Sequence, residues 1–477
     1  MKNTDLILDM KKEVDDMGIQ AAIMVPHPPL IIPEIGRGGE AAIQDTITAY
    51  HEAARRVSTY HPETIILISP HQIMYEDYFH ISPGERAEGD FGQFQAGNVA
   101  MQIAYDTELV EEICRIAGET GIPAGTMGEC EKKLDHGTMV PLYFINQYDT
   151  EYKLVRIGLS GLPLSKHYEL GQCIQSAVEK LGRKAVVIAS GDLSHRLKED
   201  GPYGYKREGP EYDKKIMDVM GRASFGELLD FPEEFLNAAG ECGHRSFVIM
   251  AGVLDQKTVQ AEKLSYEGPF GVGYGVCTYE IKGQNTGRNF YERFEKILAE
   301  KVKAQREKED AYVSLARKTI EGYICTGEKP VVPEGLPQEM YEQKAGAFVS
   351  IKKQGRLRGC IGTIQAVQSN LAAEIIENAI SAATRDPRFA PIGQEELKEL
   401  SISVDVLGTI ERISSPDELD VERYGVVVTK NGRRGLLLPN LEGIDTVREQ
   451  IAIAKQKAGI GEDEDAELER FEVVRHH

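Results

Sequence analysis

The first ~280 residues alternate short apolar runs with longer segments of helical periodicity, which is the feature that most restricts the fold. The apolar runs lie at residues 21–25, 64–69, 153–159 and 185–190, and the helical segments lie at 39–57, 107–118 and 164–181. Alternation of this kind is typical of a sheet that is covered by helices. Two further strand-like segments, 259–268 and 271–281, close the region. We therefore expect an α/β domain with a mixed sheet flanked by helices.

A second pattern begins after a densely charged segment at residues 289–310, which is typical of a solvent-facing connector helix. An amphipathic helix, several strand-like segments and an Asn431-Gly432 hairpin turn follow. This half is expected to be a smaller α+β domain. The predicted boundaries are 18–283 for the first domain, 284–309 for the connector and 310–477 for the second domain.

Composition excludes several classes of protein. The formal net charge of −21 disfavours association with phosphate backbones or anionic membranes. No apolar run approaches the ~18 residues that cross a bilayer, and the amino terminus lacks the apolar region of a secretory signal. The seven cysteines are scattered and show no C-x-x-C spacing, which indicates reduced thiols. We expect a cytoplasmic protein without nucleic-acid or membrane partners.

Four histidines lie just beyond predicted strands or in loops with turn signals. His27 stands in VPHPP, His71 in SPHQ, His136 in LDHGTMVPL and His195 in SGDLSH. Side chains just past the carboxyl ends of strands line the ligand crevice of open α/β sheets. A single histidine is most often a surface or hydrogen-bonded residue, but several in this placement predict a divalent-metal site around His27 and His71, with His136 and His195 close by.

The third ligand is expected in the segment NAAGECGHRSF. Glu241 would complete the site of two histidines and one carboxylate that suits iron(II), whereas Cys242 would give a softer site for zinc, copper(I) or thiolate-bound iron. His244 is a further candidate. The alternative is structural: Glu241 complements a helix dipole and Cys242 is a small buried residue. Local sequence leaves this choice open.

Two other residues are singled out by their neighbours. Asp192 in SGDLSH either orients His195 or forms a turn after a strand. Cys360 in LRGCIGT lies between two glycines, and Arg358 would lower the pKa of its thiol if the side chains meet. The alternative for Cys360 is a small buried residue at a strand edge.

The segments VPHPP, SPH, LDHGTMVPL and SGDLSH, in this order, resemble the catalytic B subunit (LigB) of class III extradiol ring-cleavage dioxygenases and the related Memo-like proteins. The likeness covers roughly Ile23 to Ile281. The dioxygenase resemblance implies that His27, His71 and Glu241 hold iron(II), that His195 is the acid/base and that His136 lines the site. In Memo-like proteins a cysteine matching Cys242 takes the third place.

In the second half, LRGCIGT, AATRDPRFAPI, EELKELSISVDVL and YGVVVTKNGRRGLLLP are similar to AMMECR-type domains, over about Asp310 to Arg475. A fusion of the two domain types resembles proteins of the AmmeMemoRadiSam system. That resemblance implies a radical S-adenosylmethionine (radical SAM) protein as partner and a modification or maturation pathway.

The leading hypothesis is an iron(II)-dependent, dioxygenase-type oxidoreductase that acts on a small aromatic or phenolic substrate. Its catalytic candidates are His195, His136, Asp192 and Cys360, and zinc or copper are the alternative metals. The competing hypothesis is a Memo-like metal-binding or partner-docking protein without dioxygenase turnover. A third is that the AMMECR-type half carries the main activity, with Cys360 as nucleophile. A homo-oligomer is expected in each case.

Overall fold

The computed structural model describes residues 17–128, 130, 133–441 and 444–477. The chain divides into two compact units, Met1–Phe294 and Glu295–His477, which are described separately. No helix in the described part of the chain is both long and apolar enough to cross a membrane.

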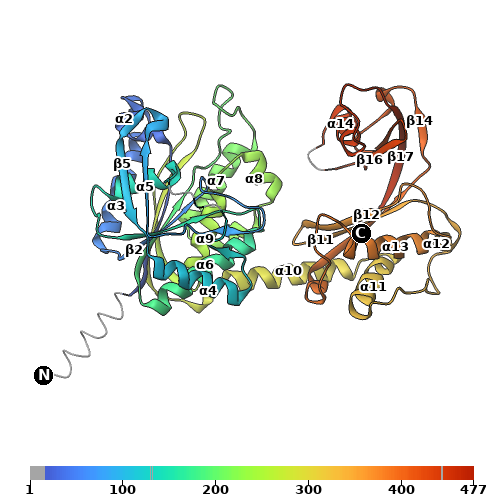
Figure 1. Cartoon of the computed structure of the whole chain (residues 1–477), viewed down its shortest axis with the longest axis horizontal. Helices are drawn as coiled ribbons and strands as arrows, with labels where there is room; N and C mark the ends of the chain where they lie inside the picture. Colours follow the sequence, from blue (N-terminus) through green and yellow to red (C-terminus); the bar gives the residue numbers. More distant parts are fainter. Residues whose placement is uncertain (1–16, 129, 131–132, 442–443) are drawn as a thin grey trace, which may run out of the picture. The chain divides into compact units, whose positions relative to one another are not determined.

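The main sheet of the first unit has six strands in the order β7-β2-β8-β1-β10-β9 (Figure 1). The strands are β1 Gly18–Val25, β2 Thr64–Ser69, β7 Lys153–Gly158, β8 Lys184–Ser190, β9 Lys257–Glu267 and β10 Tyr274–Gln284. The four strands β7, β2, β8 and β1 are mutually parallel. Strand β10 runs antiparallel to β1, and β9 runs antiparallel to β10. The sheet is therefore mixed, as predicted, and the predicted strands are confirmed.

Helices cover both faces of this sheet. On one face lie α4 Thr107–Thr120, α6 Leu164–Leu181, α7 Glu208–Gly221 and α9 His244–Val253, and on the other lie α3 Gln44–Thr59 and α5 His136–Ile145. Successive strand residues alternate between the two cores: Ile66 and Ile68 face one core, and Ile65 and Leu67 the other. Burial on both faces explains why these strands read as continuous apolar runs.

Some elements of the first unit were not predicted from the sequence. They are α2 Pro33–Gly36, β3 Phe79–His80, β4 Arg86–Phe91, β5 Ala96–Ala104, β6 Ala124–Gly125 and α8 Glu233–Ala239. The hairpin of β4 and β5 exposes much of both strands, so its residues lack the apolar run that marks the central strands.

The second unit is built on a seven-stranded antiparallel sheet in the order β12-β11-β13-β17-β15-β16, with β14 paired to β17. Its strands are β11 Ala347–Lys353, β12 Arg356–Gly362, β13 Leu400–Leu407, β14 Glu411–Ile413, β15 Tyr424–Lys430, β16 Arg433–Leu437 and β17 Glu467–His476. Its helices are α11 Ala311–Thr326, α12 Gln338–Glu342, α13 Leu371–Thr384 and α14 Val447–Lys457. Asn431 and Gly432 form the β15–β16 turn with positive φ, as the hairpin prediction requires.

The charged connector is a helix, α10 Phe290–Arg306, and the division between the units falls within it. The charge pattern predicted a solvent-facing helix, but α10 does not face solvent along its whole length. Phe290, Tyr291 and Phe294 pack against the core of the first unit, because the first turns of the helix carry aromatic side chains on one side.

A close helix crossing positions α9, which follows the Cys242 segment. A Cβ atom at Gly171 of α6 would lie 2.2 Å from the Ile249 carbonyl oxygen and 2.7 Å from the Gly252 Cα of α9. We expect Gly171→Ala to lower the free energy of unfolding by about 1–3 kcal/mol, since backbone must move to admit the methyl group. Calorimetry of the full chain measures the effect.

The matched control is Gly118→Ala in α4, where a Cβ atom would meet nothing within 4 Å. Its helix should gain about 0.5–1 kcal/mol from the loss of backbone freedom in the unfolded chain. Equal unfolding temperatures for the two variants would show that the α6–α9 crossing does not depend on glycine.

Candidate metal centre

The centre lies where three parallel strands end. β2, β8 and β1 are neighbours in the sheet, so their carboxyl ends share one edge. His27, His71 and Asp192 each stand two residues beyond the last residue of β1, β2 and β8, respectively. Equal offsets from adjacent parallel strands bring the three side chains together, which is the convergence that the sequence pattern predicted.

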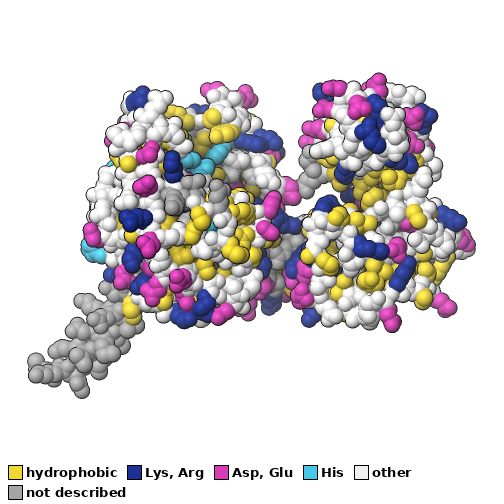
Figure 2. Space-filling model, in the orientation of Figure 1, with side chains coloured by type: hydrophobic (Ala, Val, Ile, Leu, Met, Phe, Trp, Pro, Cys, Tyr) yellow, Lys and Arg dark blue, Asp and Glu magenta, His cyan; other side chains and the backbone are white. Residues whose placement is uncertain are grey.

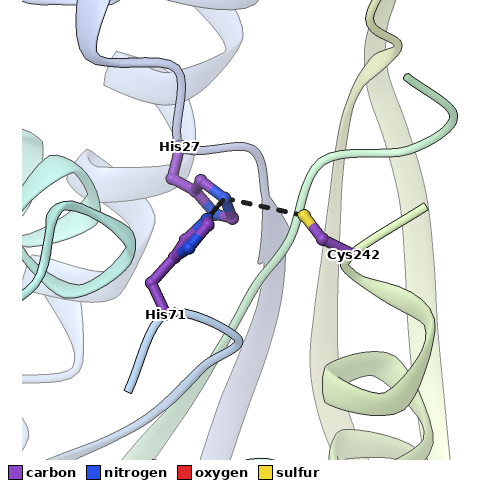
Figure 3. A group of neighbouring side chains, drawn as sticks. All are labelled: His27, His71 and Cys242. Carbon is purple, nitrogen blue, oxygen red and sulfur yellow. Dashed lines mark hydrogen bonds between the residues drawn. The ribbon is translucent and has the colours of Figure 1, made fainter. Parts of the chain in front are cut away.

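The two imidazoles meet at their Nε2 atoms, which are 2.9 Å apart (Figure 3). The rings are nearly perpendicular, at 84°. His27 is buried and His71 is exposed, so solvent reaches the pair from the side of His71. Figure 2 shows histidine side chains beside hydrophobic ones on the visible face of the first unit.

Ser190, the last residue of β8, determines which nitrogen of His27 faces the centre. Its hydroxyl donates to the Gly137 carbonyl oxygen at 2.6 Å and lies 3.0 Å from His27 Nδ1. Because the hydroxyl has one proton and donates it to Gly137, it accepts from the Nδ1–H of His27. The Nε2 lone pair is therefore free to face the centre, which is the tautomer that a metal ligand requires.

Cys242 supplies the third side chain. Its Sγ is 3.7 Å from His27 Nε2, and it comes from the loop before α9 (Figure 3). Among the described residues, the ligand atoms of His27, His71 and Cys242 lie within 4.8 Å of one another. Burial, followed by the negative charges of Asp192 and Glu241, raises the pKa of the thiol well above its ordinary value. A bound cation would have to displace that proton.

Glu241 is placed differently. Its Oε2 accepts the backbone N–H of His244 at 2.5 Å, so it caps the first turn of α9, and it belongs to neither of the potential metal-binding groups found among the described residues. Burial raises its pKa to about 7. His244 points into the core, where its ring nitrogens contact the Tyr212 hydroxyl and the Leu228 carbonyl oxygen.

Two glycines allow the Cys242 loop to reach the strand ends. A Cβ atom at Gly191 would lie 2.1 Å from Gly243 Cα, and one at Gly243 would lie 2.9 Å from Gly191 Cα. The loops are also joined by hydrogen bonds from the Gly243 N–H to the Asp192 carbonyl and from the Asp192 N–H to Cys242 Sγ. Any larger residue at either glycine would push Cys242 away from His27.

Asp192 forms a hydrogen bond with His27. No hydrogen bond joins Asp192 to His195 among the described residues. The Asp192 Oδ1 accepts the His27 backbone N–H at 2.8 Å, and its Oδ2 is 4.0 Å from His27 Nε2. Burial raises its pKa to about 7. Asp192 also forms a second potential metal-binding group with His195 and Cys242, next to the first.

His136 and His195 lie beside the pair. His136 is the first residue of α5, and its ring centroid is 4.0 Å from that of His71 and 5.6 Å from that of Phe94. The His195 ring centroid lies 5.1 Å from that of Tyr203, with the rings tilted by 34°, and its Nε2 is buried without a hydrogen-bond partner in the described part of the chain. Burial lowers the pKa of both histidines to about 4, so both rings are neutral at pH 7.

Asp135 explains the DHGT segment. It caps α5 by accepting from the Thr138 N–H at 2.9 Å, and it accepts the Ser69 hydroxyl of β2 at 2.5 Å. A Cβ atom at Gly137 would lie 2.5 Å from Ser69 Oγ. The segment therefore ties the start of α5 to the strand end that precedes His71.

Cys360 lies in the second unit, on the edge strand β12. The expected contact with Arg358 is not found: Arg358 pairs with Glu396 at 2.8 Å and with backbone carbonyls of a neighbouring loop. The two residues share a strand face, but the guanidinium is drawn to the nearby carboxylate.

Sequence reasoning missed several residues of the centre. Ser190 reads as the polar end of an apolar strand, while Phe94 and Tyr203 lie in loops without a recognisable motif. The small residue after β8 and the Cys242-Gly243 dipeptide were the available signals for the close approach of the two loops.

Comparison with known proteins agrees with the division of the chain into two units. Residues 21–277 match the family described as the catalytic LigB subunit of aromatic ring-opening dioxygenase, and residues 313–476 match the AMMECR1 family. A Clostridium acetobutylicum protein is 42% identical over 468 residues, covering 96% of this chain and 99% of its own length. A Thermotoga maritima protein is 49% identical over 170 residues, 35% of this chain and 98% of its own.

Solved structures were also found. An uncharacterised Pyrococcus horikoshii protein is 34% identical, with a TM-score of 0.33, over 35% of this chain and 91% of its own. An uncharacterised Escherichia coli protein is 14% identical, with a TM-score of 0.36, over 55% of this chain and 99% of its own. The chain therefore belongs to the LigB family in its first unit, followed by a domain of the AMMECR1 family in its second.

Proposed function

We propose that the first unit is an iron(II)-dependent oxidoreductase whose metal is held by His27, His71 and Cys242 and whose substrate is a small aromatic or phenolic compound. The observation that carries the proposal is the convergence of two Nε2 atoms at 2.9 Å with a sulfur at 3.7 Å. The family match of residues 21–277 supports the reaction class.

The spacing of these atoms fits a common metal ion. With bonds of about 2.0–2.1 Å to imidazole nitrogen and about 2.3 Å to sulfur, ligand angles from about 90° to about 109° place two nitrogens about 2.9–3.4 Å apart and a sulfur about 3.1–3.6 Å from a nitrogen. The 2.9 Å between the Nε2 atoms of His27 and His71 lies at the lower end of the first range, and the 3.7 Å from His27 Nε2 to Cys242 Sγ lies just above the second. The unprotonated Nε2 of His27 is already oriented for coordination.

When bound, iron(II) supplies redox chemistry and open coordination positions for substrate and O2. The neighbouring side chains would bind the substrate and accept its proton. His195, with an unpartnered Nε2, would accept a phenolic proton from the substrate, and His136 would border it. Phe94 and Tyr203, which flank these two rings, would hold a planar substrate between aromatic faces.

A second candidate function is a Memo-like metal-binding or partner-docking protein without dioxygenase turnover. Cys242, not Glu241, approaches His27, and a thiolate suits zinc or copper(I) as well as iron. The two candidates share the metal ligands but differ in O2 consumption. Anaerobically reconstituted protein should consume O2 with catechol-type compounds if the first is correct, and none if the second is.

A radical SAM protein is proposed as the partner of the chain. The fusion of a LigB-type domain to an AMMECR1 domain supports it, because this arrangement resembles the AmmeMemoRadiSam system. In such a system the metal centre would serve a modification or maturation pathway.

Metal content of ligand variants tests the centre itself. We expect His27→Ala, His71→Ala and Cys242→Ala each to lower metal affinity by at least about 100-fold, since each removes a donor atom. Glu241→Gln should keep the metal, because the amide oxygen can still accept the His244 N–H. Iron and zinc are quantified by mass spectrometry after anaerobic purification, with unfolding temperature as the control for folding.

Two outcomes would contradict this assignment. Metal content that is unchanged in a His27→Ala, His71→Ala double variant would exclude the centre. Metal that is lost in folded Glu241→Gln but kept in Cys242→Ala would make Glu241 the third ligand.

The tautomer of His27 gives a separate prediction. Ser190→Ala removes the acceptor for Nδ1–H, so the ring loses its fixed orientation, and metal affinity should fall about 10- to 100-fold. Ser176→Ala, which removes an exposed hydroxyl on α6, is the matched control and should leave affinity unchanged. Equal affinity in the two variants, measured by competition with a chelator, would show that Ser190 does not orient the ligand.

A further inference from the structure

The sheet of the second unit has one face that is not packed on α11 and α13. Alternate residues of β11 and β13, such as Val349 and Val404, face those helices, so the residues between them face the other way. Cys360 of β12 pairs with Ser350 of β11, which pairs with Ser403 of β13. A thiol and two hydroxyls therefore form a row across three strands.

The glycines of the LRGCIG segment explain why the thiol is presented on this face. A Cβ atom at Gly359 would lie 2.2 Å from the Ala382 carbonyl oxygen of α13. Glycine there lets β12 lie against the helix while the next residue, Cys360, projects from the opposite face, where it is half-buried. The Ser350 hydroxyl donates to Cys360 Sγ at 3.2 Å.

Three cations from three different segments lie near enough to this thiol to interact with it electrostatically. Arg388 lies in the loop after α13, Lys457 ends α14 and Arg475 lies in β17, and each interacts electrostatically with Cys360. Arg388 also donates to the Cys360 carbonyl oxygen at 3.2 Å. The thiol is therefore next to residues that are 28, 97 and 115 positions away in the sequence.

Two of the three cations are neutralised and one is not. Arg388 pairs with Asp386 at 2.7 Å, and Arg475 pairs with Asp405 at 2.7 Å. Lys457 has no carboxylate partner among the residues that the structure describes. Lys457 is exposed as a residue, but desolvation of its ammonium group and the nearby Arg388 charge lower its pKa, whereas a Cys360 thiolate would raise it. The cluster therefore has an uncompensated positive charge beside a nucleophile.

We propose that this cluster is a binding site for the anionic group of a small molecule, a carboxylate or a phosphate, which Lys457 holds against Cys360. An anion would supply the charge that Lys457 lacks, and Arg388 and Arg475 would add to the attraction from their ion pairs. All residues of this site belong to the second unit, whereas the residues of the candidate metal centre belong to the first. This site does not depend on the function proposed for the first unit.

Alkylation of the full chain tests the site with charged and neutral reagents of similar size. The Cys360 thiolate attacks the methylene carbon of iodoacetate or iodoacetamide, a C–S bond forms and iodide leaves. At each cysteine the rate with iodoacetate is divided by the rate with iodoacetamide, and the quotient at Cys360 is then divided by the quotient at exposed Cys325. The result does not depend on the intrinsic reactivity of the two reagents or on the thiolate fraction of either cysteine. Peptide mass spectrometry measures both cysteines in one sample.

We expect this normalised preference for the anionic reagent to be at least about tenfold at low salt and to fall toward one at 1 M salt, where the Debye length shortens to about 3 Å. Lys457→Gln should reduce it about threefold or more, and Lys457→Arg should restore it. Lys455→Gln, two residues earlier on α14, is the matched control and should leave it unchanged, since Lys455 lines a different cavity.

Protection distinguishes the two anion classes. Inorganic phosphate and acetate are compared at equal ionic strength, and the one that slows iodoacetate at Cys360 without slowing it at Cys325 identifies the bound group. A normalised preference near one in the wild-type chain, no change in Lys457→Gln, or protection by neither anion would overturn the proposal.

Discussion

The contact between Gly191 and Gly243 is the constraint on which the metal centre depends. These two backbones approach so closely that neither position admits a Cβ atom. Gly191 follows β8, whose parallel neighbours β1 and β2 end two residues before His27 and His71, and Gly243 precedes α9. The contact therefore joins two segments more than 50 residues apart, and it places a cysteine against two histidines that the sheet has already brought together.

Hydrogen bonds around this contact determine how each donor atom is presented. Ser190 orients the His27 ring, Asp192 holds the His27 backbone, and the Asp192 N–H points to Cys242 Sγ. Both residues, Ser190 and Asp192, come from the end of β8. The end of β8 thus positions both His27 and the loop that carries Cys242. Helix α9, which follows that loop, is positioned by its close crossing with α6.

The sequence predicted the elements of the fold that are buried on two sides, because these leave continuous apolar runs, as in β2. It also predicted the position of His27 and His71 at strand ends. The sequence could not decide whether Glu241 or Cys242 is the third ligand. The two residues are adjacent in the sequence, and only the structure shows in which direction each side chain points. The structure directs Glu241 to the first turn of α9 and the thiol to His27. The sequence could not predict the cations near Cys360, since Arg475 is placed by the pairing of β13 with β17 and Lys457 lies at the end of α14.

We propose that the first unit holds a metal at a centre assembled by backbone contact, and that the second unit has a binding site with its own nucleophile. Anomalous diffraction at the iron and zinc edges, from crystals grown without oxygen, tests the central claim most directly. The account predicts one peak at about 2.0–2.1 Å from both Nε2 atoms of His27 and His71 and at about 2.3 Å from Cys242 Sγ. A peak bound to the Glu241 carboxylate, with Cys242 Sγ beyond bonding distance, would contradict it.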